Sequence, residues 1–150
     1  MARETYHDIA TQQIIGGREE QLANQRRYAE SLVHPFEGSV PSSDDYNTQM
    51  ARVAQTEKDI ECIKVASGLR VNSRVFSDTA RGIIDGVPVK IVLDYGQNQS
   101  ALSYRGTIDG VEIAGDDAKS FWETFGRPAK AIYDRAEFLK TMSVETSVKV

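Results

Sequence analysis

The sequence predicts an α+β fold in which helices come first, an antiparallel sheet follows, and helices return near the C-terminus. Apolar residues recur at helical spacing up to about residue 68, alternate with a period of two up to about residue 115, and then return to helical spacing. Strict alternation gives one buried and one wetter face, which is typical of antiparallel sheets. We expect a single domain over 1–150, with a helical part at 1–68, a sheet at 69–115, C-terminal helices at 116–142 packed on one sheet face, and a tail at 143–150.

Two long helices are expected in the first part of the chain. Residues 3–15 have helical apolar spacing, but Gly16 and Gly17 follow. Two adjacent glycines cost about 2 kcal/mol in a helix interior, so we expect a break or a kink there. The helices at 18–34 and 44–67 are long enough to pack as an antiparallel hairpin, with a Pro- and Gly-containing loop between them.

A nine-residue stretch occurs twice in the sheet region. RGIIDGVPV at 81–89 returns as RGTIDGVEI at 105–113. Asp-Gly between alternating apolar residues predicts a type I′ turn, in which both central residues have positive φ. With turns at Asp85-Gly86 and Asp109-Gly110, apolar cross-strand partners share one face in both hairpins. The repeat therefore predicts an antiparallel meander of four to five strands over about 71–114, with strands near 80–84, 87–95, 100–108 and 111–114 and a fifth at 71–76.

The C-terminal helices carry an aromatic stripe. Segment 121–125 holds two phenylalanines and the tryptophan at helical spacing. We expect this stripe to approach Gly82 and Gly106 on the apolar sheet face, because a glycine allows close contact with the backbone. The segment 126–128, with Gly and Pro, predicts a stop and a restart of the helix. The tail 143–150 alternates weakly, which fits either a short edge strand or a frayed terminus.

The basic residues of the sheet region are the candidates for a ligand or partner site. Arg81 and Arg105 fall on the face opposite to the apolar one, with Lys90 beside Arg81. Guanidinium groups gathered on one face can bind phosphate or carboxylate. Tyr104 and Asn98 are the polar residues that would complete such a site. The simpler interpretation is a solvated face, balanced by acidic residues of the same strands.

Signatures of catalysis are missing from the sequence. Cys62 lies at the edge of an apolar helical stripe, as a small core residue would. His7 and His34 are far apart, and neither has the i, i+4 partner that a helical metal site uses. No phosphate-loop motif occurs. We therefore expect no catalytic residue, no metal and no cofactor.

Two functions stay open at this point. The first is a non-catalytic interaction protein, such as an accessory protein or a phage-encoded inhibitor, that acts as a homo-oligomer because its long helices have narrow apolar stripes. The second is a protein that binds or sequesters a small anionic, nucleotide-like ligand on the basic sheet face. Nucleic-acid binding is the least favoured, since the net charge is −4. A single cysteine and the lack of a long apolar segment predict a cytoplasmic protein without a membrane partner.

Overall fold

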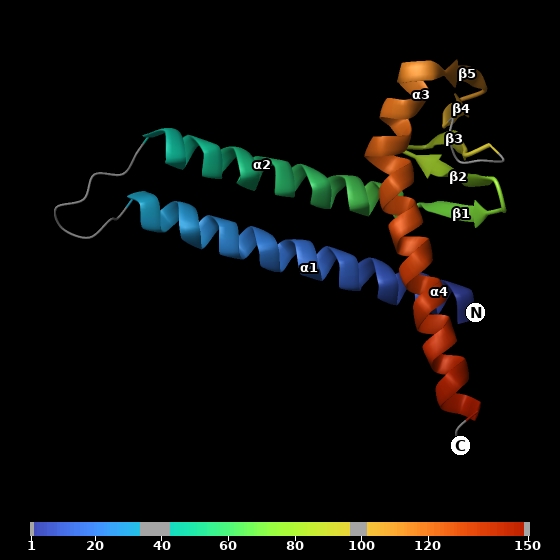
Figure 1. The fold of residues 1–150 in the computed structure, drawn as a ribbon, viewed down its shortest axis with the longest axis horizontal. Helices are drawn as coiled ribbons and strands as arrows, with labels where there is room; N and C mark the ends of the chain where they lie inside the picture. Colours follow the sequence, from blue (N-terminus) through green and yellow to red (C-terminus); the bar gives the residue numbers. More distant parts are fainter. Residues whose placement is uncertain (1, 34–42, 97–101, 149–150) are drawn as a thin grey trace. The chain divides into compact units, whose positions relative to one another are not determined.

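The structure, a computed structural model, describes residues 2–33, 43–96 and 102–148 and confirms the α+β fold. Two helices lead into five strands, and a helical segment completes the chain (Figure 1). The loop expected after the first helix and the link between the two hairpins lie almost wholly outside the described residues. In the described part, no helix is both long and apolar enough to cross a membrane.

The chain divides into two compact units. Gln13–Glu61 forms one unit, and Met1–Gln12 with Cys62–Val150 forms the other. We call the first the hairpin unit and the second the sheet unit, and describe each by itself.

The sheet unit is built on five antiparallel strands in the order β1-β2-β3-β4-β5, so every strand pairs with its neighbour in the sequence. The expected fifth strand exists but begins and ends earlier than predicted, and Arg74 and Phe76 lie beyond its end. The strands are β1 Leu69–Ser73, β2 Ser77–Ile84, β3 Val87–Asp94, β4 Ser103–Ile108 and β5 Val111–Ala114.

Both repeated stretches form the predicted hairpins. Asp85 and Asp109 have φ of 52° and 53°, and they are the non-glycine residues with positive φ in the described part of the chain. Gly86 and Gly110 follow with φ of 78° and 81°, as a type I′ turn requires. The register is also as predicted: Ile84 pairs with Val87, Gly82 with Val89, Ile108 with Val111 and Gly106 with Ile113.

The apolar face of the sheet forms the core, which we call the inner face. On β3, Val89, Ile91 and Leu93 are buried there, as the alternation predicts. Val92 points to the opposite, outer face and is also buried, so the outer face is not uniformly wet. The buried core cluster consists of Ala66, Leu69, Ala80, Val89, Ile91, Leu93, Ala118, Trp122 and Ala129.

The C-terminal helical segment packs against this sheet without the stop predicted at 126–128. It comprises α3 (Gly115–Phe121), the π-helical turn η1 (Trp122–Gly126) and α4 (Arg127–Val148). The Arg127 N–H donates to the Trp122 carbonyl, five residues back. Proline in a helix interior disturbs the regular bonding pattern, and the π-turn that ends two residues before Pro128 accommodates that disturbance. Since α4 continues through Val148, the tail is not an edge strand.

The atoms nearest to the open side of Gly82 and Gly106 belong to the backbone and side chains of neighbouring segments of the sheet. The aromatic stripe, which was predicted to make this contact, is not the nearest neighbour. A Cβ at Gly106 would collide with the Lys90 carbonyl and lie 3.1 Å from the Ile91 Cα on β3. A Cβ at Gly82 would collide in the same way with the backbone of Gly68, which precedes β1. The close approach that these glycines allow is therefore between backbones at the sheet itself.

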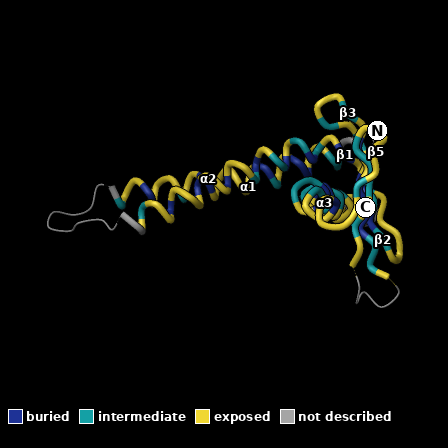
Figure 2. Tube along the Cα trace, turned by 90° about the horizontal axis from the view of Figure 1, so that it is seen from above, coloured by how far each residue is buried: buried dark blue, intermediate teal, exposed yellow. Residues whose placement is uncertain are grey.

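In the hairpin unit, the helices α1 (Ala2–Val33) and α2 (Ser43–Ala66) lie side by side (Figures 1 and 2). Gln49 Nε2 donates to the Gln25 carbonyl at 3.1 Å, and Arg26 pairs with Glu57 at 2.9 Å. The break predicted at Gly16-Gly17 is wrong, because α1 is continuous there.

A seam of buried residues explains why the glycines are tolerated. Within Gln13–Glu61, the buried positions are Ile15, Leu22 and Ala29 on α1 and Gln49, Val53, Thr56 and Ile60 on α2. The buried residues are seven positions apart on α1 and three or four positions apart on α2, which are the spacings of a coiled coil. Packing of this seam on both sides of the glycines offsets their weak helix propensity.

Candidate functional site

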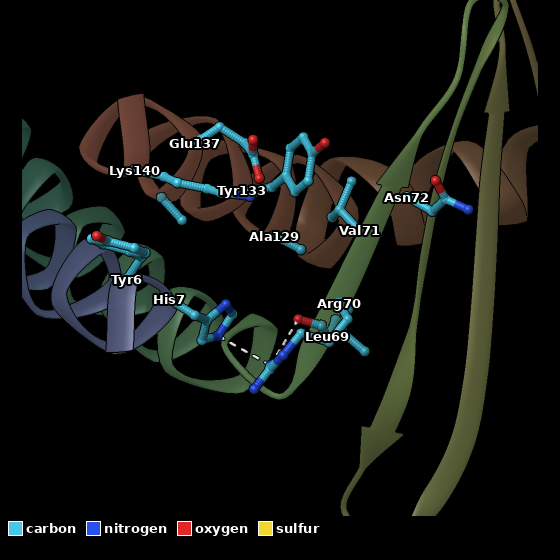
Figure 3. A pocket seen from close by; sticks show the side chains of 11 residues that line it. Tyr6, His7, Leu69, Arg70, Val71, Asn72, Ala129, Tyr133, Glu137 and Lys140 are labelled. Carbon is cyan, nitrogen blue, oxygen red and sulfur yellow. Dashed lines mark hydrogen bonds between the residues drawn. The ribbon is translucent and has the colours of Figure 1, made fainter. Parts of the chain in front are cut away.

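A cleft of about 520 Å³ lies at the β1 edge of the sheet unit, between β1, the first turns of α1 and α4 (Figure 3). One wall carries Tyr6 and His7 of α1, and the opposite wall is formed by α4. Its lining consists of Tyr6, His7, residues 69–72, Ala129, Tyr133, Ala136, Glu137 and Lys140.

The cleft runs along the open edge of β1 rather than over one face of the sheet. Leu69 is buried in the core and Val71 packs against it, so both belong to the inner face. Arg70 and Asn72 alternate with them and belong to the outer face. Since side chains of both faces line the cleft, the cleft lies against the edge where β1 has no neighbouring strand.

The backbone of Val71 offers open hydrogen-bonding groups at this edge. The Arg74 N–H donates to the Ser77 carbonyl at 2.7 Å, which continues the β1–β2 ladder past Ser73. Bonded and non-bonded pairs alternate in an antiparallel ladder, so the bonds to β2 fall on Arg70 and Asn72. The Val71 N–H and C=O therefore point away from β2, toward the cleft.

At one end of the cleft, His7 and Arg70 share an acceptor. His7 Nε2 lies 2.8 Å from the Ser67 carbonyl oxygen, and Arg70 Nη1 donates to the same oxygen at 3.0 Å. Nε2 cannot both donate to this oxygen and accept from Arg70, 3.1 Å away, so the shorter distance assigns the proton to Nε2. Ser67 directly follows α2, where cationic donors are favourable. Both side chains thus cap α2 and hold α1 beside β1.

The α4 wall supplies the groups that are available to a ligand. Tyr133, Glu137 and Lys140 lie on this wall, one turn apart (Figure 3). Lys130 Nζ lies 5.3 Å from the centre of the Tyr133 ring. The lining thus combines aromatic rings with three basic side chains, His7, Arg70 and Lys140, against one acidic side chain.

The outer face of the sheet holds three of the five residues that the sequence singles out. Arg81 lies directly opposite Lys90, and Arg105 lies opposite Val92 on the next pair of strands. Tyr104 points to the inner face and packs against the core, because neighbouring residues of a strand face opposite sides. Asn98 lies outside the described residues.

The two repeated arginines have different surroundings. Arg105 Nε donates to Asp94 Oδ2 at 3.2 Å. Arg81 and Lys90 have no ion pair or hydrogen bond with another side chain among the residues that the structure describes. The two copies of the repeat therefore form the same turn, but their arginines differ: Arg105 is in an ion pair and Arg81 is not.

Comparisons with known proteins add nothing to this geometry: no family model, curated protein or solved structure matches the chain. Within the described ranges, no group of three or more His, Cys, Asp or Glu side chains could hold a metal ion. The sequence does not reveal the cleft, since residues 6–7, 69–72 and 129–140 meet only in the folded chain. The one residue of the cleft that the sequence could have drawn attention to is Arg70, a basic residue at the start of the strand region.

Proposed function

We propose that the protein is a non-catalytic binding protein that takes up an extended segment of a partner chain along the open edge of β1. The observation that carries this proposal is the position of the cleft, which follows the edge and is lined from both faces of the strand. An exposed strand edge is a template for pairing with another chain.

Main-chain bonds would supply much of the affinity. An added strand uses the open N–H and C=O groups of the edge, and its alternate side chains enter neighbouring pockets. The Val71 N–H and C=O are available for two such bonds. A cleft of about 520 Å³ gives room for side chains beside the new strand.

The lining indicates which side chains the partner would present. Tyr6 and Tyr133 offer aromatic surface on opposite walls. Lys140 on the α4 wall is a cation within reach of the partner, so an acidic side chain next to an apolar one fits best.

Peptide selection tests the proposal. A phage library of random 12-residue peptides, panned on the intact protein, should yield β-prone acidic sequences. On binding the selected peptide, hydrogen exchange at the Val71 amide should slow, because that N–H becomes bonded. The Asn72 amide already bonds to β2 and should change little.

A proline variant gives the decisive comparison. Val71→Pro removes an N–H that the β1–β2 ladder does not use, and an edge strand tolerates such a proline. It should weaken peptide binding by about 1 kcal/mol or more, the net value of one hydrogen bond. Val71→Ala keeps the N–H and is the matched control. Equal binding by Val71→Pro and the wild type would exclude strand addition.

A further inference from the structure

We infer that the outer sheet face holds a second site, in which Arg81 and Lys90 bind the phosphate group of a phosphate monoester. This inference does not depend on strand addition at β1, because Arg81 and Lys90 do not line that cleft.

The two cations are held in the closer of the two kinds of cross-strand pair. The Tyr95 N–H donates to the Phe76 carbonyl at 2.8 Å, which sets the alternation along β2 and β3. Counting from that pair, Arg81 and Lys90 form a non-hydrogen-bonded pair. The Cα atoms of such pairs are about 4.5 Å apart, and their side chains lie close together.

An anion would offset the repulsion between these cations. Like charges directly opposite each other destabilise a sheet. Arg70 lies opposite Arg81 on the other side, so cations occupy three adjacent strands of one row. The nearest acid in that row is Glu112, which is separated from Lys90 by Thr107.

Four other cations of the described chain form ion pairs. Arg105 is paired with Asp94, as are Arg26 with Glu57, Arg127 with Glu123 and Lys130 with Asp134. Arg81 and Lys90 form no such pair with a described residue, so both side chains remain open to an anion.

A hollow beside the two cations has the composition that a phosphate monoester needs. It has a volume of about 370 Å³ and is lined by Arg81, Lys90 and Thr107 together with Ile83 and Pro88. Two cations and a hydroxyl suit the charge and the three acceptor oxygens of a phosphate. Ile83 is 63% exposed and, with Pro88, offers apolar surface for the organic part.

Titration of the ¹⁵N-labelled protein with phenyl phosphate, at constant ionic strength, tests this site. Amide shifts should saturate at Arg81, Lys90 and Thr107. Arg81→Gln and Lys90→Gln should each lower the affinity about tenfold or more, the effect of losing a charge-assisted hydrogen bond. Arg105→Gln is the matched control, since its guanidinium is paired with Asp94, and it should bind as the wild type does.

Two further probes decide the ligand class. Benzoate has the same ring with a carboxylate, and binding as tight as that of phenyl phosphate would overturn the assignment to phosphate. Chloride at the same ionic strength should give no saturating shifts. Shifts that fail to saturate with phenyl phosphate, or an Arg105→Gln variant as weak as Arg81→Gln, would overturn the site itself. Val71→Pro should leave this binding unchanged, which separates the two sites.

Discussion

At the scale of single residues, the surroundings of a glycine decide what that glycine contributes. Gly86 and Gly110 supply the positive φ of the hairpin turns. Gly106 has another role, because the space that a side chain would need is filled by the backbone of β3. Its place in the repeat is thus explained by close contact between strands.

Gly106→Ala should lower the free energy of unfolding by about 1–3 kcal/mol, as overpacking does in a filled interior. The added Cβ meets the Lys90 carbonyl, which cannot move without disturbing the β3–β4 pairing. Urea denaturation measures the change. Ser103→Ala on the same strand is exposed and serves as the control. Equal stability of Gly106→Ala and the wild type would show that the sheet opens at no cost.

At the scale of elements, α1 shows how tertiary packing overrides local preference. Gly16 and Gly17 lie inside a continuous helix, and a Cβ at either would meet nothing within 4 Å. Their only effect is therefore the weak helix propensity of glycine itself.

Replacing both glycines with alanine should raise the free energy of unfolding by about 1–2 kcal/mol, because each glycine costs up to about 1 kcal/mol in a helix. The contrasting variant is Gly126→Ala. Its Cβ would collide with the Trp122 ring, so the same substitution should destabilise the sheet unit. Thermal denaturation compares the two variants, and a loss of stability in Gly16→Ala/Gly17→Ala would mean that α1 needs flexibility there.

Elements defined by local chemistry could be predicted, and those defined by distant contacts could not. The Asp-Gly turns require positive φ wherever they occur, so Asp85 and Asp109 gave both hairpins and their register. Helix α1 is continuous at Gly16 because it packs against α2, and the C-terminal helical segment is continuous at Pro128 because a π-turn precedes it. Local residue preferences predict neither of these contacts. For the same reason the proposed phosphate site was partly predictable: alternation placed Arg81 with Lys90 on one face, but the ion pair of Arg105 with Asp94 appears only in the structure.

At the scale of the whole molecule, self-association stays a prediction from the sequence. In the hairpin unit, Tyr28 is 55% exposed and Met50 is 39% exposed, so apolar surface remains outside the seam. We expect a homo-dimer, in which a second copy covers such surface. Light scattering should then give twice the chain mass of 16.7 kDa. A mass of 16.7 kDa over a broad range of concentrations would rule this out.

The position of Trp122 gives the two compact units separate optical signals. It is the single tryptophan of the chain and is buried in the core of the sheet unit. Its fluorescence therefore follows the unfolding of that unit, whereas far-ultraviolet circular dichroism also includes the helices of Gln13–Glu61. Coincident transitions by both signals would mean that the chain unfolds as one cooperative system. A dichroism change that precedes the fluorescence change would mean that the hairpin unit melts while the sheet unit, with both proposed binding sites, is still folded.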